Sequence, residues 1–243
     1  MKVKAIISAL MLMACGMASA QTKTYLNVET APGVYKSFEV NKDLKISWGE
    51  KKEVPPTTGT AKRTGDVDVK WVQLWENGPK FAEYNIGANS ATEYGGYYAW
   101  GGSQDKVDDH NTTNDGSGNL TGTDDTATNL WGSKWRMPTK AEFEALLNSD
   151  NCEVEWTTNY NGTGKNGLLC TGKDAYSSNS VFLPAAGYCD DGNVDCQGTF
   201  GVYWSSTPES SYEAYLLDFN SRDQFVVNDE RRHGFSVRAV FAE

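Results

Sequence analysis

GVYWSSTPESSYEAYLLDFNSRDQFVVNDERRHGFSVRAV, residues 201–240, is the stretch that decides the fold of this chain. Short apolar runs alternate in it with turn-rich polar clusters, and this spacing indicates an antiparallel meander of strands rather than helices. Within the run 215–219 the residues follow the period of two that is typical of a strand. The polar clusters at 220–223 and 228–231 contain residues that suit tight turns, so we expect strands on either side of each.

The end of this stretch predicts a half-buried strand that closes the domain. Apolar residues alternate with polar ones, which is the pattern of a strand with one face on the core and one in solvent. The core face would carry Phe235, Val237, Ala239 and Phe241, and the other face Ser236 and Arg238. We expect the apolar face to seal the core and to leave the rim of the meander free to contact a ligand.

Four ordered blocks of sequence carry a resemblance to a known family. They are AEYNIGANSATEYGGYYAWGG (82–102), WGSKWRMPTKAEFEALL (131–147), VFLPAAGY (181–188) and YWSSTPES…RRHGFSVRAV (203–240). Together they resemble the Fibrobacter succinogenes major paralogous domain, a family of secreted bacterial modules related to the C-type lectin fold. The resemblance extends over roughly residues 66–243.

The resemblance implies an α+β fold, a C-type-lectin-like domain with antiparallel sheets, two short helices and long loops. In such folds the first and last strands of the domain pair. Either Val67–Leu74 or Phe81–Ile86 is therefore expected beside Phe235–Phe241.

Local signals predict where the two helices lie. Thr139 is the expected N-cap of a helix over Lys140–Asn148, and Glu142 completes a capping box with it. A shorter helix over Thr126–Trp131 follows Asp125, which is a favourable N-cap residue.

The first residues of the chain predict export. Residues 1–20 have a basic start, an apolar run and small residues before Gln21, which is the pattern of a secretory signal peptide. A loose lipobox ends at Cys15, so a lipid anchor on that cysteine is the alternative. We therefore expect an exported protein that is secreted or held at the cell surface.

The rest of the chain divides into three segments by composition. Residues 21–48 show a strand-like alternation and predict a small β unit. Residues 49–65 are rich in Lys, Pro, Thr and Gly and predict a linker, which leaves 66–243 as the main domain.

Charge and hydropathy exclude several classes of partner. The formal net charge of −10 at pH 7 repels phosphate backbones and anionic lipid headgroups, so neither nucleic acid nor a membrane surface is expected as a partner. Beyond the signal peptide, no segment is apolar enough to predict a transmembrane helix.

Four cysteines remain after Cys15, and in an exported chain they predict two disulfides. Three connectivities are possible, and we favour Cys152–Cys170 and Cys189–Cys196 because each pair brackets its own turn. The alternative, a zinc site of four thiolates, lacks the CxxC spacing that such sites show.

Enzymatic motifs are not found in the sequence. The GxSxG nucleophile elbow is absent, and the predicted disulfides leave no cysteine nucleophile. With 32 acidic residues a chance pair of carboxylates is expected, so such a pair would not indicate a glycoside hydrolase. We therefore predict no catalytic residue.

The polar stretch 101–124 and the two histidines are the candidates for a metal site. The stretch holds several Asp and Asn residues that suit calcium, but no register fits an EF-hand, and the calcium-binding sugar motifs of C-type lectins are not matched. His110 and His233 have no spacing that favours zinc and are interpreted as surface histidines. No cofactor is predicted, and calcium is the alternative.

These patterns predict an exported, non-catalytic binding module for a glycan or an extracellular protein. The alternative is a structural subunit of a surface assembly, in which residues 21–48 add a strand to another chain. An enzyme is the least favoured class. The candidate ligand-binding residues are polar positions around the late meander, where loops on a rigid scaffold can vary. They are Glu209, Tyr212, Glu213, Arg222, Gln224, Asn228 and Arg231.

Overall fold

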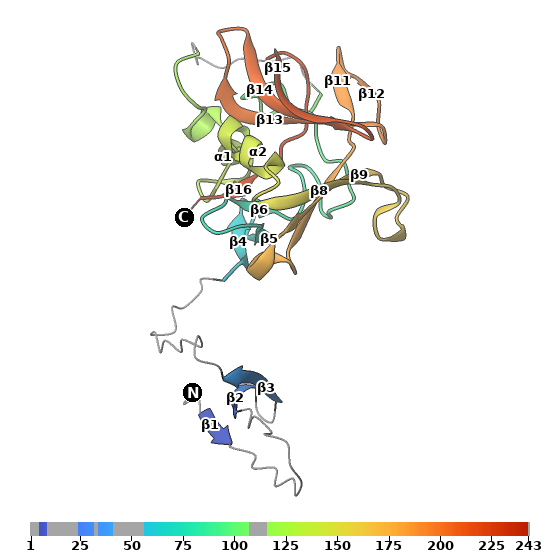
Figure 1. Ribbon diagram of the computed structural model, residues 1–243. Coiled ribbons are helices and arrows are strands. Elements are labelled where there is room, and N and C mark those ends of the chain that lie inside the picture. The colour runs from blue at the N-terminus through green and yellow to red at the C-terminus, as the bar shows by residue number, and fades with distance from the viewer. Residues whose placement is uncertain (1–4, 9–23, 32–33, 41–55, 107–115, 243) are drawn as a thin grey trace, which may run out of the picture. The chain divides into compact units, whose positions relative to one another are not determined.

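The computed structural model describes residues 5–8, 24–31, 34–40, 56–106 and 116–242, and the chain divides into two units, Met1–Val54 and Pro55–Glu243. The first unit contains an antiparallel sheet in the order β1-β2-β3 (Figure 1). Its strands are β1 (Ala5–Ser8), β2 (Thr24–Ala31) and β3 (Val34–Val40). β2 and β3 lie where the alternation predicts strands, and β1 lies in the predicted signal peptide, whose cleavage stays a prediction.

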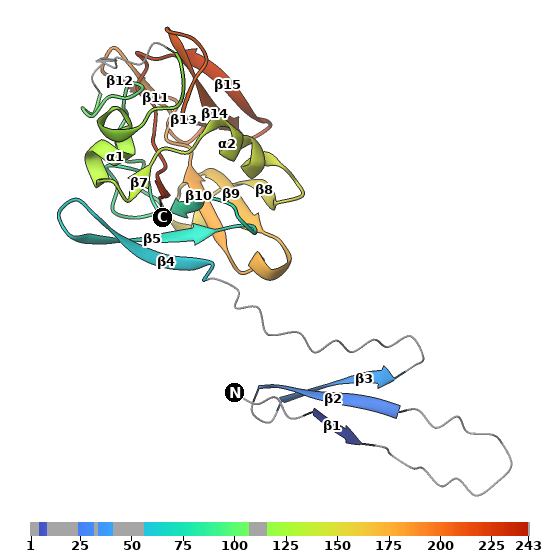
Figure 2. The ribbon, with the colours of Figure 1, turned by 90° about the vertical axis from the view of Figure 1, so that its left-hand side faces the viewer.

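A five-stranded antiparallel sheet joins the two ends of the second unit (Figure 2). Its order is β4 (Thr58–Arg63), β5 (Val67–Gln73), β6 (Lys80–Ala82), β16 (Val240–Phe241) and β7 (Trp135–Arg136). Val240 lies opposite Phe81, and the Ile86 backbone nitrogen donates to the Val237 carbonyl oxygen over 2.9 Å. The expected pairing of Phe81–Ile86 with the C-terminal segment is therefore confirmed.

β4 corrects the prediction of a linker over 49–65. Its residues pair with β5 in an antiparallel register. Ala61 is buried, and Gly59 lies against the Trp71 indole, which leaves no room for a side chain. The strand has almost no apolar residues and is held by backbone pairing to an amphipathic neighbour, so its hydrophobic pattern did not reveal it.

Two smaller antiparallel arrangements precede the meander in the chain. One is a sheet in the order β10-β9-β8, and the other is the hairpin β11-β12. Their strands are β8 (Cys152–Thr157), β9 (Gly167–Gly172), β10 (Ser180–Pro184), β11 (Tyr188–Asp190) and β12 (Asn193–Asp195).

The predicted antiparallel meander is confirmed as the sheet β13-β14-β15. Its strands are β13 (Phe200–Pro208), β14 (Glu213–Asn220) and β15 (Gln224–Glu230). The first predicted turn, at 220–223, joins β14 to β15. The second, at 228–231, is wrong, because the ladder continues to Glu230 opposite Glu213 and the chain turns only after it.

Both predicted helices are present, as α1 (Thr126–Trp131) and α2 (Lys140–Leu147). Asp125 caps α1 by accepting from the Thr128 backbone nitrogen. At α2 the capping box forms as predicted, because Thr139 and Glu142 each accept from the other's backbone nitrogen. α2 packs against all three strands of the meander. Short 3₁₀ turns occur at Gly122–Asp124, Tyr160–Gly162 and Asp174–Tyr176.

The C-terminal segment is buried on both sides, which corrects the prediction of a half-buried strand. Phe235, Val237 and Ala239 face one hydrophobic cluster as expected, but Ser236 and Arg238 are fully buried as well. The segment runs between two clusters of core residues, so its polar side has no access to solvent.

The four cysteines of the second unit are thiols, so the predicted disulfides are corrected. Cys152 on β8 lies opposite Gly172, and Cys170 on β9 lies opposite Val154, so the two cysteines are diagonal neighbours. Diagonal positions of an antiparallel pair are about 7–8 Å apart. That distance exceeds the separation an unstrained disulfide spans.

The second predicted pair is offset in the same way. Cys189 on β11 is buried and lies opposite Val194. Cys196 follows the end of β12 and is exposed. In neither pair does the structure place the two cysteines directly opposite each other.

The described residues thus form antiparallel β sheets with two short α-helices, an α+β fold in which strands dominate. Among them, no helix is both long and apolar enough to span a bilayer.

Candidate functional site

Three of the four sequence blocks that carry the resemblance, 82–102, 181–188 and 203–240, meet in a buried hydrogen-bond network. Arg238 is fully buried, and its Nε donates to Asn85 Oδ1 over 2.9 Å. Its terminal nitrogens donate to the carbonyl oxygens of Ala82 and Phe182 over 3.1 and 2.9 Å. Asn85 Nδ2 in turn donates to the Tyr203 hydroxyl over 3.1 Å. These residues build the core, so a binding site has to be sought elsewhere.

Four of the predicted ligand residues are scattered over the exposed rim of the meander. Arg222 and Gln224 lie at the turn between β14 and β15, and Asn228 lies on β15. Glu209 lies in the loop between β13 and β14, where its backbone nitrogen donates to the Glu213 carbonyl oxygen over 3.0 Å. The structure does not bring these four side chains together.

The other three, Tyr212, Glu213 and Arg231, line one hollow of about 450 Å³. Tyr212 is 80% exposed there, but Arg231 is only 3% exposed. The Arg231 guanidinium carbon lies 4.1 Å from the centre of a Trp100 ring, and its nitrogens donate to the carbonyl oxygens of Ser210 and Glu213. Arg231 therefore holds the loop between β13 and β14 in place.

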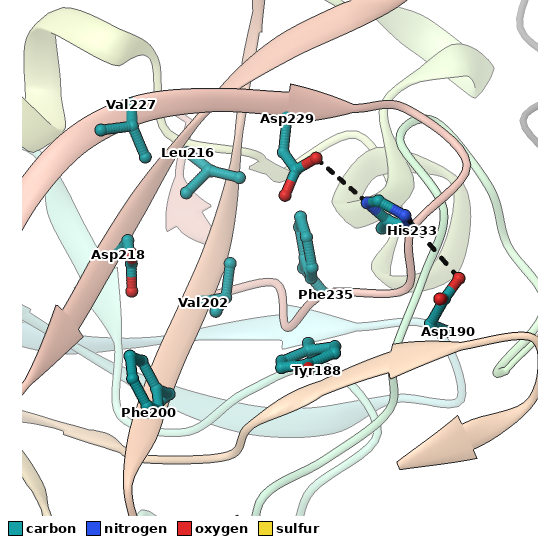
Figure 3. A pocket seen from close by; sticks show the side chains of 10 residues that line it. All are labelled: Tyr188, Asp190, Phe200, Val202, Leu216, Asp218, Val227, Asp229, His233 and Phe235. Carbon is teal, nitrogen blue, oxygen red and sulfur yellow. Dashed lines mark hydrogen bonds and ion pairs between the residues drawn. The ribbon is translucent and has the colours of Figure 1, made fainter. Parts of the chain in front are cut away.

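A separate pocket of about 380 Å³ lies where the meander approaches β11 (Figure 3). One face of the meander packs against α2 and the core cluster that contains Tyr203 and Leu217. On the opposite face, the end near the β14–β15 turn is open. The lining residues are Tyr188, Asp190, Phe200, Val202, Leu216, Asp218, Val227, Asp229, His233 and Phe235.

Strand register places an acidic residue on the apolar floor of this pocket. Asp218 on β14 lies opposite Val202 on β13 and Phe225 on β15. Its Oδ1 is buried and has no hydrogen-bond partner within the described part of the chain. Burial, and to a smaller extent the charge of Asp229, raises the pKa of the Asp218 carboxyl. A ligand that donates a hydrogen bond here would satisfy an otherwise costly group.

The opposite side of the pocket carries a histidine between two carboxylates. His233 Nδ1 lies 3.1 Å from Asp229 Oδ1, and Nε2 lies 3.7 Å from Asp190 Oδ1. Arg232 donates to Asp190 over 2.9 Å, and the Glu230 backbone nitrogen donates to Asp229 over 2.7 Å. Both of these oxygens already have donors, in contrast to Asp218 Oδ1.

Aromatic rings form part of the walls of this pocket. Phe200 is 38% exposed, and Tyr188 is partly exposed, so both rings can contact a ligand. Phe235 is buried and packs 4.5 Å, centre to centre, from the Trp204 ring. The pocket thus combines apolar rings with a buried carboxylate oxygen, Asp218 Oδ1, that lacks a partner.

The pocket lies on the meander where the sequence predicts the ligand contacts, but none of the seven predicted residues lines it. His233, interpreted as a surface histidine, lies in the pocket wall with a side chain only 18% exposed. One feature of the sequence could have indicated the pocket, because Asp218 interrupts the apolar run of β14. His110 and residues 107–115 of the acidic loop lie outside the described residues.

Metal binding finds no support within the described ranges, where no group of three or more His, Cys, Asp or Glu residues is placed to hold an ion. Two acids of the polar stretch and its border have structural roles. Asp105 accepts from the Tyr97 backbone nitrogen over 2.7 Å, and Asp125 accepts from the Met137 backbone nitrogen over 2.8 Å.

Comparison with known proteins gives one match. A family model described as a domain of unknown function (DUF8237) matches residues 171–240. All ten residues that line the pocket lie within that range. No curated protein and no solved structure matches the chain.

Proposed function

We propose that this protein is an exported, non-catalytic binding module whose pocket on the meander binds a sugar residue of a glycan. The observation that carries the proposal is the buried, unpartnered Asp218 Oδ1 beside the exposed Phe200 ring. An apolar ring can stack on a sugar, and a carboxylate can accept from its polar groups. A volume of about 380 Å³ is near the lower end for ligand pockets and suits a single ring.

A C-type-lectin-like fold for the second unit is part of this proposal. It is supported by the four sequence blocks, by two short helices ahead of the later sheets, and by β16 pairing with β6. Export is supported by the pattern of residues 1–20, with a lipid anchor on Cys15 as the alternative.

A binding role is favoured over catalysis by the composition of the pocket. Its ten lining residues include no serine, threonine or cysteine that could act as a nucleophile. The His233 imidazole lies between Asp229 and Asp190, with no such nucleophile beside it in the lining.

A glycan and protein array probed with the purified full chain tests the proposal. We expect binding to a set of glycans, and we expect Phe200→Ala to weaken it because the stacking ring is lost. Tyr212→Ala is the matched control, since it removes an exposed ring from the separate hollow. An array without bound glycans, together with turnover in a panel of hydrolase substrates, would contradict the proposal.

A surface assembly is the second candidate, and the first unit favours it. In that unit β1 pairs with β2, with Ala5 opposite Val28 and Ser8 opposite Tyr25. Cleavage of the predicted signal peptide would remove β1 and leave that edge of β2 without its partner. An unpaired edge accepts a strand from another chain.

Light scattering of the mature chain, with and without residues 21–54, tests the assembly. We expect oligomers of the longer protein and monomers of the shorter one. Monomers of both would argue against strand addition.

A further inference from the structure

We infer that the sugar taken by this pocket carries a free amino group, which binds Asp218 as an ammonium. This inference rests on the proposed function and names the ligand class of the same site. Three features of the pocket carry it: an open acceptor, an excess of negative charge, and two chemically different ends.

The open acceptor is one carboxylate oxygen of Asp218. Its Oδ1 is buried without a donor, and its cross-strand neighbours Val202 and Phe225 cannot supply one. A buried unsatisfied oxygen costs free energy that a bound donor recovers. Because the acceptor is a carboxylate, a charged donor gives a stronger hydrogen bond than a neutral hydroxyl does.

The balance of charge in the pocket favours a cation. Asp190, Asp218 and Asp229 all line it. Arg232 already pairs with Asp190 at 2.9 Å and with Glu230 at 2.7 Å, and His233 lies between Asp190 and Asp229. Asp218 has no ion pair within the described part of the chain. An acidic sugar would be repelled, whereas an ammonium would be attracted to the aspartates.

The two ends of the pocket differ in what they offer. Figure 3 shows Asp218 and Phe200 on one side, and Asp229, His233 and Asp190 on the other, with the apolar floor between them. A sugar ring can direct an ammonium to the first side and hydroxyl groups to the second. A lysine side chain has a single donor group and would leave the second side unfilled, so the amino sugar fits better.

Titration calorimetry with glucosamine oligomers, near pH 6 and at low salt, tests the inference. The N-acetylated oligomer of the same length is the matched ligand, because it keeps the ring and removes the charge. We expect the free amine to bind at least about tenfold more tightly. Asp218→Asn should weaken that binding by a similar factor, and added salt should weaken it too.

Asp223→Asn is the control variant, since it removes an exposed carboxylate from the neighbouring turn and should leave the affinity unchanged. A melting curve of each variant verifies that it is folded. Equal affinity for both oligomers, or unchanged binding by Asp218→Asn, would overturn the inference while glycan binding stands. Binding of Nα-acetyllysine amide when neither oligomer binds would also overturn the inference. Failure of every glycan would overturn the proposed function itself.

Discussion

Asp218 is a residue that the fold does not need in its charged form. Burial raises the pKa of its carboxyl, the Asp229 charge raises it further, and a hydrogen bond from the Phe219 backbone lowers it by less. A raised pKa means that the folded state disfavours the carboxylate, so the charge destabilises the domain at neutral pH. Groups that cost stability in this way concentrate at binding sites.

Asp218→Asn is therefore expected to stabilise the unliganded protein. At neutral pH we expect the free energy of unfolding to rise by up to about 1 kcal/mol, because the buried charge is removed. As the pH falls through the raised pKa, the wild-type carboxyl takes up a proton and the difference disappears. Urea unfolding at several pH values measures this, with Asp223→Asn as the control. A variant less stable than the wild type at neutral pH would contradict it.

Arg238 is also buried, but the fold depends on its hydrogen-bond donors. Burial lowers the pKa of Arg238 to about 10, so the guanidinium stays charged at neutral pH. Arg238→Met would leave Asn85 Oδ1 and two carbonyl oxygens without their donors. We expect a loss of several kcal/mol in urea unfolding, because each buried acceptor left without a donor costs about 1–3 kcal/mol. Arg238→Lys should recover part of it, since one ammonium cannot reach three divergent acceptors. Wild-type stability of the methionine variant would refute this role.

At the scale of elements, the N-terminus of α2 shows how one carboxylate supports two contacts. Glu142 accepts from the Thr139 backbone nitrogen over 2.7 Å and from both terminal nitrogens of Arg136 over 2.5 and 2.8 Å. Burial raises the pKa of Glu142, but the bonds from Arg136 and Thr139 outweigh it, so the pKa is lowered overall.

Glu142→Gln is expected to cost about 1–2 kcal/mol at neutral pH, because the capping box and the ion pair are both weakened. A lowered pKa contributes stability that is present above the unfolded-state value of about 4.3 and is lost as the pH falls through the folded-state value. The difference between wild type and variant should therefore shrink in acid. Glu144→Gln, on the exposed side of the helix, is the control and should change stability by less than about 0.5 kcal/mol. Thermal melts of the wild type and the two variants at several pH values measure these stability differences.

What the sequence predicted about each element depended on how far its partners lie along the chain. α2 was predicted with its cap because Thr139 and Glu142 are three residues apart. The burial of the polar side of 235–241 was not predicted, because Arg238 forms hydrogen bonds with groups more than fifty residues away in the chain. The pocket also arises from strand register, which places Asp218 beside Phe225, and register is not readable from a single strand.

At the scale of the whole molecule, the start of the second unit decides where the chain can be cut. The sequence places the domain boundary at residue 66, but the structure adds β4, which precedes it. β4 and the residue before it supply acceptors to buried donors of the core. The Trp135 indole nitrogen donates to the Lys62 carbonyl oxygen over 3.1 Å, and the Gln73 backbone nitrogen donates to the Thr57 carbonyl oxygen over 2.8 Å.

Residues 55–243 are therefore expected to melt at the temperature of the full chain, whereas residues 66–243 should melt lower. The shorter chain leaves the Trp135 indole without its acceptor, exposes the Trp71 ring that lies against Gly59, and makes β5 an unpaired edge. One buried donor without a partner already costs about 1–3 kcal/mol, which in a domain of this size lowers the melting temperature by several degrees. Differential scanning calorimetry of the three chains measures it. Equal melting of 55–243 and 66–243 would show that β4 adds nothing to the core, and the boundary read from composition would then be the right one.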